Sequence, residues 1–211
     1  VLFLDELPEF SRNALETLRQ PLEDREITIS RAKYSATLPS SFMLVASMNP
    51  CPCGYYNHPT HTCQCSPGQI HKYMNRISGP LMDRIDIQVE VTPVSVTDLA
   101  HMPAGESSEQ IRQRVIAARE LQTERYKQLK GIHCNAQMTR ALLEQYARLD
   151  EEASQVLTRA MNRMNLSARA YDRILRVSRT IADLEASPHI QAKHVKEAVG
   201  YRNLDRADWG E

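Results

Sequence analysis

Two adjacent carboxylates, Asp5 and Glu6, follow directly after the apolar run Val1–Leu4. A strand that ends in such a pair can deliver both side chains to a site. There, one carboxylate can hold Mg²⁺ and the other can orient or activate an attacking water. The alternative is structural, because a carboxylate at a strand end also serves as a turn former or a helix cap. The pair by itself does not decide between the two.

A polar residue, Asn49, follows a second apolar run, Phe42–Ala46. If the two runs form neighbouring parallel strands, Asn49 lies beside Asp5 and Glu6, where its amide can hold a water or a phosphate group. The alternative is an ordinary Asn-Pro turn with Pro50.

Four of the five cysteines fall in one short segment, with two histidines between the pairs: Cys51, Cys53, Cys63, Cys65, His58 and His61. Clustered thiolates suit tetrahedral Zn²⁺. In the reducing cytoplasm disulfides are rare, so for a protein of that compartment zinc ligation is the better interpretation. The alternative is a reduced surface loop that holds no metal. Because the segment follows Asn49 directly, its expected role is structural bracing, not catalysis.

Composition limits the class of protein. The chain has 211 residues, 26 basic and 26 acidic residues and a formal net charge of +0. A quarter of the residues are charged, which is typical of a soluble globular protein. No apolar run is long enough for a membrane span, and no signal peptide is visible. The zero net charge excludes a globally basic nucleic-acid coat, so contacts with nucleic acid must come from local patches or from several subunits of a ring.

The elements that must position these residues are strands and one helix. The runs Val1–Leu4 and Phe42–Ala46 are continuous, as central parallel strands buried on both faces would be. The run Ile85–Val91 alternates, which predicts a half-exposed strand. Between the first two runs Ser11 can cap a helix that Pro21 should end or kink. Residues 25–38 then read as a hairpin with Arg31 and Lys33 near its tip.

After residue 93 the pattern changes to that of helices. Residues 94–106 form a polar linker, and residues 107–211 form an all-α domain. The pattern predicts a long helix that starts after Ser107, a helix capped by Thr139, one over Glu151–Met164, one after Ser167, and a short one near Gln191–Val199. The predicted architecture is therefore an α/β part over residues 1–93, followed by the helical domain.

The order of these features resembles that of the AAA+ ATPases. The apolar strand ending in Asp-Glu, the helix, the hairpin and the strand ending in Met48-Asn49-Pro50 are followed by Gly79–Asp86. Within the AAA+ class, the chain is similar to the magnesium-chelatase-like competence proteins, the ComM/YifB family, over essentially its whole length. The resemblance implies a partial P-loop core with a parallel sheet, followed by a helical lid.

The resemblance also implies roles for individual residues. Asp5 and Glu6 match the Walker B pair, which coordinates Mg²⁺ and activates water, and Asn49 matches the sensor-1 position. Arg84 matches the arginine finger that reaches the nucleotide of a neighbouring subunit, and Arg169 matches sensor 2. The implied cofactors are ATP and Mg²⁺, beside a possible structural Zn²⁺.

One departure from the family pattern is the absence of a phosphate-binding loop. No Gly-x-x-x-x-Gly-Lys-Ser/Thr occurs in the sequence. We therefore expect a C-terminal fragment that begins at Walker B and hydrolyses ATP poorly alone, the intact parent being the enzyme. Without the strand that carries the loop, the Asn49 strand and the run Ile85–Val91 would not pair as they do in the family.

The hairpin with Arg31 and Lys33 resembles the basic pre-sensor-1 hairpin of ring helicases such as the minichromosome maintenance proteins. There it touches DNA phosphates, which gives a salt-sensitive grip that is independent of sequence. The alternative is a solvated hairpin, since charged residues are ordinary on edge strands.

The resulting expectation is a ring-forming homo-oligomer, a hexamer, that moves on DNA in helicase-like branch migration during transformation and recombination. Two alternatives stay open: a magnesium-chelatase-type motor that remodels a partner protein and, for the isolated fragment, a non-catalytic oligomerisation module.

Overall fold

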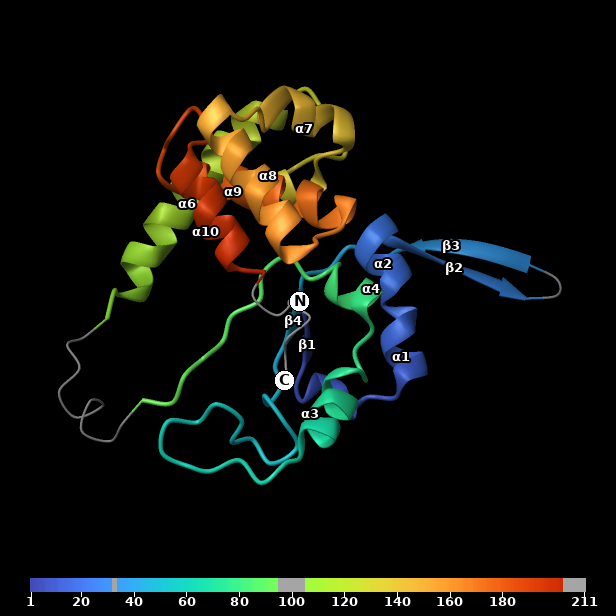
Figure 1. Ribbon diagram of the computed structural model, residues 1–211. Helices are drawn as coiled ribbons and strands as arrows, with labels where there is room; N and C mark the ends of the chain where they lie inside the picture. Colours follow the sequence, from blue (N-terminus) through green and yellow to red (C-terminus); the bar gives the residue numbers. More distant parts are fainter. Residues whose placement is uncertain (32–33, 95–104, 203–211) are drawn as a thin grey trace. The chain divides into compact units, whose positions relative to one another are not determined.

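The computed structural model describes residues 1–31, 34–94 and 105–202 (Figure 1). The chain forms two compact units, the first over Val1–Ile85 and the second beginning at Asp86. This division falls earlier in the chain than the boundary predicted from composition at residue 93. Each unit has its own hydrophobic core.

A parallel pair of strands lies in the first unit. β1 (Leu2–Leu4) pairs with β4 (Leu44–Ala46), with Leu2 opposite Leu44. The predicted parallel neighbours are therefore confirmed. The prediction that both strands are buried on both faces is wrong for one face. Phe3 and Val45, which lie opposite each other, are 60% and 40% exposed, because no described element covers that face.

The segment between β1 and the hairpin contains η1 (Leu7–Glu9), α1 (Arg12–Thr17) and α2 (Arg19–Asp24). Ser11 caps α1 as predicted, accepting a hydrogen bond from the amide of Ala14. The helical segment is interrupted at Leu18, which separates α1 from α2. The ring of Pro21 would clash with the carbonyl of the residue four positions before it, Thr17, so one continuous helix is disfavoured here. The core of the unit consists of Leu7, Leu15, Ile77 and Leu81.

The predicted hairpin is present. β2 (Glu26–Arg31) and β3 (Tyr34–Pro39) are antiparallel, with Arg31 opposite Tyr34 at the turn end. Figure 1 shows the hairpin extending away from α1 and α2. Arg31 is exposed near the tip, whereas Lys33 lies outside the described residues.

A loop and two short helices complete the first unit. We call residues 51–65 the thiol loop, because it carries the four clustered cysteines. It follows β4 and leads into α3 (Pro67–Met74), which Ser66 caps, and then α4 (Gly79–Met82), which Ser78 caps.

The strand predicted over Ile85–Val91 is wrong, because this segment joins no sheet in the described part of the chain. A strand needs a neighbour for its backbone groups, and none of the described strands lies alongside. Instead, the amide of Gln88 donates to the carbonyl of Tyr201 at 2.8 Å, which ties the segment to the end of the helical unit.

The second unit is helical, as predicted. Its helices are α6 (Ser108–Tyr126), η2 (Asn135–Gln137), α7 (Arg140–Tyr146), α8 (Glu151–Met164), α9 (Ala168–Leu184) and α10 (Ala192–Gly200). Ser107 caps α6 in a capping box, and Ser167 caps α9. In the described residues no helix is long and apolar enough to cross a membrane.

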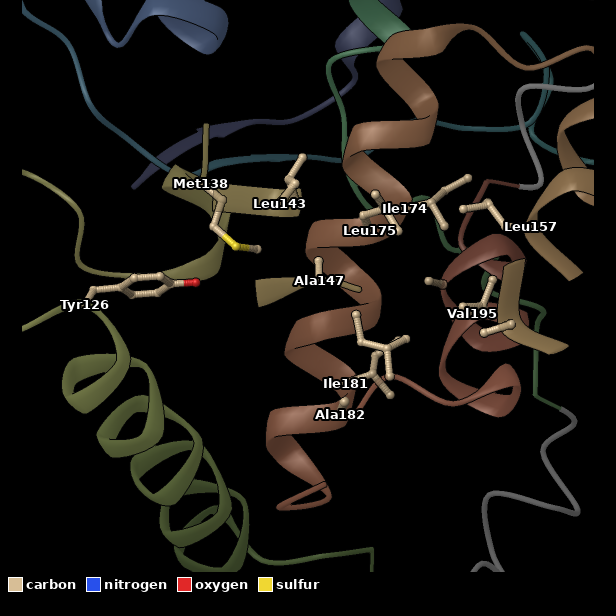
Figure 2. Close-up of a cluster of buried hydrophobic side chains, with 13 residues drawn as sticks. Tyr126, Met138, Leu143, Ala147, Leu157, Ile174, Leu175, Ile181, Ala182 and Val195 are labelled. Carbon is tan, nitrogen blue, oxygen red and sulfur yellow. The ribbon is translucent and has the colours of Figure 1, made fainter. Parts of the chain in front are cut away.

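The core of the second unit gathers around α9. Figure 2 shows Ile174, Leu175, Ile181 and Ala182 on this helix, with Val195 of α10 beside them. The buried side chains come from α6, α7, α8, α9 and α10 and from the segments that join them, and α9 contributes the most of them.

A buried polar network joins α6, η2 and α9 at the carboxylate of Asp183, whose side chain is 1% exposed. Arg125 donates to its two oxygens at 2.7 and 2.5 Å, and Arg179 donates to Oδ1 at 3.1 Å. The side-chain amide of Asn135 donates to Oδ2 at 2.8 Å. A single carboxylate thus balances two arginines in a site closed to water.

We expect Asp183→Asn to lower the free energy of unfolding of the second unit by about 3–5 kcal/mol, since removing one partner leaves buried guanidinium charge uncompensated. Urea denaturation followed by circular dichroism measures this loss. The control is Glu124→Gln, which removes an exposed ion pair with Lys127 and should cost under about 1 kcal/mol. Equal losses in both variants would contradict the prediction.

Candidate functional site

The carboxyl ends of β1 and β4 share one edge of the parallel sheet, and the polar residues predicted for a site follow those ends. The amide of Ser47 donates to the carbonyl of Leu4 at 3.0 Å, and the amide of Leu7 donates to the carbonyl of Ser47 at 2.9 Å. These bonds extend the ladder past both strand ends. The hydroxyl of Ser47 donates to Oδ1 of Asp5, so the two strand ends are also joined through side chains. We call Asp5, Glu6, Ser47 and Asn49 the carboxylate edge.

Glu6 has an unusual backbone. Its φ of 52° and ψ of 50° lie in the left-handed region, which costs a residue other than glycine about 1–3 kcal/mol. Its amide donates to Oδ1 of Asp5 at 3.1 Å, and both carboxylates are exposed. The turn therefore directs two adjacent carboxylates to solvent at the sheet edge, where a cation and a water can reach them.

The backbone of Asn49 is held by α3. The backbone amide of Asn49 points toward the phenol oxygen of Tyr73, which is buried on α3. Burial raises the pKa of Tyr73, and the carboxylate of Glu9 adds to this shift, so the phenol stays neutral. The Asn49 side chain is left exposed at the same edge as Asp5 and Glu6.

Arg84 follows α4 and is buried within the first unit. Its Nε lies 2.9 Å from a carboxylate oxygen of Glu23, and one terminal nitrogen donates to the carbonyl of Pro80 at 2.6 Å.

Arg169 lies in the first turn of α9 in the second unit and is exposed. One turn later Arg173 is buried and donates to Asp86 at 2.5 Å. This bond fixes the segment that follows Arg84 in sequence against the helix that carries Arg169. The structure brings Asp5, Glu6 and Asn49 to one edge, while Arg169 belongs to the other unit.

Sequence reasoning missed three residues that support these positions: Ser47, Tyr73 and Arg173. The role of Ser47 could have been predicted, because Ser47 is a polar residue directly after an apolar run and two residues before Asn49. The roles of Tyr73 and Arg173 could not have been predicted from local sequence, because their partners are distant in the chain.

The thiol loop brings four sulfur atoms together. Cys51, Cys53, Cys63 and Cys65 offer ligand atoms that all lie within 4.8 Å of one another. The sulfur of Cys51 is 3.4 Å from that of Cys53 and 3.7 Å from that of Cys63, and the last two are 3.6 Å apart. A tetrahedron with metal–sulfur bonds of about 2.3 Å has edges of about 3.8 Å. The cluster can therefore hold a metal ion.

Cys53 and Cys65 differ in acidity. The backbone amides of Tyr55 and Gln64 lower the pKa of Cys53 to about 6, whereas burial raises the pKa of Cys65 to about 12. Thiolates that crowd together repel each other, so all four ionise together only when a cation compensates them. This donor set suits a thiophilic divalent ion.

Two family models match the chain. The model for magnesium chelatase, subunit ChlI, matches residues 1–99, and the model for the C-terminal part of ChlI matches residues 105–202. The competence protein ComM of Haemophilus influenzae is 46% identical over 207 residues, which covers 98% of this chain and 39% of that protein. The chain belongs to the ComM/YifB family.

Two further proteins are similar to this chain. The uncharacterized protein YifB of Escherichia coli K12 is 43% identical over 210 residues, 98% of this chain and 40% of that protein. The maternal DNA replication licensing factor mcm6 of Xenopus tropicalis is 25% identical over 215 residues, 94% of this chain and 24% of that protein. The chain spans about two fifths of the length of ComM and YifB. The fold is a partial AAA+ core followed by a helical C-terminal domain.

Proposed function

We propose that this ComM/YifB-family chain forms part of a Mg²⁺-dependent AAA+ ATPase that works on DNA. The observation that carries the proposal is the parallel β1–β4 pair, whose carboxyl ends present Asp5, Glu6 and Asn49 at one edge. Ligands bind at that edge in open α/β sheets.

Each residue of the edge has a separate task in this proposal. Asp5 holds Mg²⁺, Glu6 orients and deprotonates the attacking water, and Asn49 holds that water or the γ-phosphate. Arg169 contacts the γ-phosphate from the start of α9. The sequence has no Gly-x-x-x-x-Gly-Lys-Ser/Thr, so these residues supply only part of the nucleotide site.

Arg84 makes the proposed enzyme an oligomer. An arginine finger acts on a nucleotide bound to the neighbouring subunit, so every site needs two copies of the chain. A closed ring satisfies this need for every copy, and we propose a homohexamer. Such a motor, which consumes ATP and acts on DNA in transformation and recombination, works in the cytoplasm.

The hairpin is the proposed DNA contact. It extends from the first unit with Arg31 exposed near its tip, where a guanidinium can bind phosphates (Figure 1). Lys33, which lies outside the described residues, is the second proposed contact. Branch migration by a ring that grips DNA in this way is the specific activity that we propose.

We expect Arg31→Ala in the full-length protein to weaken DNA binding and to abolish stimulation of the ATPase by DNA, while the basal ATPase rate stays unchanged. Each lost phosphate contact should reduce the slope of log K against log [salt] by about 0.7–0.9. Titration of labelled DNA at several salt concentrations measures this slope. Arg159→Ala, which removes an exposed arginine on α8, is the control and should change neither quantity.

A second candidate function is a magnesium-chelatase-type motor that remodels a partner protein. The match of the ChlI model to residues 1–99 favours it. An ATPase rate that does not respond to DNA, with unwinding unaffected by Arg31→Ala, would support this function over the first.

Zn²⁺ is the ion that we assign to the thiol loop. It is the common metal of tetrahedral sites with four thiolates, and the sulfur separations match its bond lengths. Cys51 follows Asn49 by two residues, so the ion would brace the backbone that leads out of the carboxylate edge. No open coordination position remains, and the role is structural.

A further inference from the structure

The thiol loop also carries a cluster of three aromatic rings. Tyr55 and His61 are stacked, with ring centroids 5.0 Å apart and an angle of 13° between the planes. The ring of His58 meets both edge-on, with its centroid 4.6 Å from that of His61 and 5.5 Å from that of Tyr55. Both geometries are favourable for aromatic pairs.

Local hydrogen bonds hold these rings in place. Nδ1 of His58 accepts from the amides of Thr60 and His61 at 3.2 and 3.1 Å. The hydroxyl of Thr60 lies 3.1 Å from Nδ1 of His61. Since the backbone occupies Nδ1 of His58, and the ligand cluster contains cysteines alone, the two histidines are not needed for the metal.

The stack faces solvent. Tyr55 is 42% exposed, and His61 is also exposed, so aromatic surface stays in contact with water. The three rings pack on one another and not into either core, so their mutual contacts hold the exposed aromatic surface in one arrangement. An exposed ring that its neighbours hold in place is suited to stacking against a further ring.

The distribution of acidic residues indicates the charge of the partner that the three rings can bind. No Asp or Glu occurs between Glu26 and Asp83, although the chain has 26 acidic residues. The same stretch contains most of the hairpin, the thiol loop and α3, and its lysines and arginines are Arg31, Lys33, Lys72 and Arg76. Arg76 pairs with Glu9 at 3.0 Å, so it adds little net positive charge. The described contacts of Tyr55, His58 and His61 include no carboxylate, so no negative charge beside these rings would repel an anion. A polyanion that carries aromatic rings fits this surface.

We propose that Tyr55 and His61 form a stacking platform for the bases of single-stranded nucleic acid. The inference deepens the proposed function and rests on it, because it adds a second contact to the one assigned to the hairpin. Every base has a π-face, so such a platform binds without sequence preference, and no carboxylate contacts the two rings to repel the phosphates of the strand.

The test compares Tyr55→Ala with Tyr55→Phe in the full-length protein, since phenylalanine keeps the ring and alanine removes it. The probe is a fluorescein-labelled oligothymidine strand. Base–aromatic stacking is worth about 1–3 kcal/mol, so we expect Tyr55→Ala to bind about 5- to 150-fold more weakly. Tyr55→Phe should bind like the unaltered protein. Zinc content, measured by X-ray fluorescence, should equal one ion per chain in all three proteins.

Photochemical cross-linking gives a readout that a merely structural ring would not produce. An oligonucleotide with 5-iodouracil reacts on irradiation with aromatic rings that stack on it. We expect mass spectrometry to find adducts at Tyr55 or His61 of the unaltered protein. This measurement also decides the case in which Tyr55→Ala loses zinc, because it uses no variant.

The outcomes separate the platform from the proposed function. If the full-length protein binds no DNA, both proposals fail. If binding depends on Arg31 while Tyr55→Ala binds as tightly as Tyr55→Phe, and no adduct forms within residues 55–61, the platform alone is overturned. A protein without bound zinc would overturn the assigned metal, and the Tyr55 comparison would still decide the platform.

Discussion

Replacing Glu6 with Gln in the full-length protein should lower kcat of ATP hydrolysis by about 10²- to 10⁴-fold, the usual contribution of a positioned general base. The glutamine side chain has the same shape but cannot take a proton from water. Asp5, the proposed Mg²⁺ ligand, is unaltered in this variant, so nucleotide affinity should change little. Steady-state ATPase rates measure the loss, and equilibrium binding of a labelled ATP analogue measures the affinity.

The matched control for this variant is Glu9→Gln. Glu9 is a nearby exposed carboxylate, but it pairs with Arg76 at 3.0 Å and follows the sheet edge by a turn of helix η1. It should leave kcat unchanged. If Glu6→Gln retained the full rate, Glu6 would be no more than a turn former, and its strained backbone would lack a catalytic explanation.

Replacing Arg84 with Ala should reduce kcat by about 10³- to 10⁵-fold, as the loss of an arginine finger does in comparable enzymes. The guanidinium spreads the charge that develops on the phosphoryl oxygens. The Arg84 side chain is also 8% exposed and donates to the carbonyl of Pro80, so its loss removes packing from the first unit and gives a second explanation for a lower rate.

Mixing subunits separates the two explanations. Arg84→Ala subunits keep Glu6, and Glu6→Gln subunits keep Arg84, so a mixed ring contains interfaces with both groups intact. We expect the mixture to recover ATPase activity that neither variant has alone. Absence of recovery, with both variants folded and assembled, would show that Arg84 acts within its own subunit.

Glu23→Gln serves as the structural control. The Glu23 side chain is 42% exposed, so its ion pair with Arg84 contributes little to stability. This variant should fold normally and keep its ATPase activity, because it frees Arg84 without removing it. A drop as large as that of Arg84→Ala would mean that the pair, not the finger, is what the enzyme needs.

Local signals predicted much of the fold. Ser11, Ser107 and Ser167 begin helices where the sequence places them, because an N-cap bond involves residues only three positions apart. The break before Pro21 is local for the same reason. The helix over Glu151–Met164 has the predicted bounds, since its apolar residues repeat with helical spacing along one continuous segment.

Long-range pairing was the least predictable part. The alternating run Ile85–Val91 has the pattern of a strand, yet a strand forms only when another backbone lies beside it. Phe3 and Val45 have the composition of a buried sheet and are exposed, because burial depends on what covers the face. The missing strand over Ile85–Val91 and the exposure of Phe3 and Val45 both depend on other parts of the chain, so local sequence could not predict them.

For the candidate site, the sequence by itself determined which chemical groups are available: Asp5-Glu6 at one strand end, Asn49 after another, and four cysteines in a short loop. The tertiary structure decided which of them meet. It paired β1 with β4 in parallel, joined Ser47 to Asp5, and gathered the sulfurs within 4.8 Å. It also buried Arg84 beside Glu23, which no spacing could indicate. The physical reason is range, since residue type fixes the chemistry whereas contact between distant segments depends on the whole packed chain.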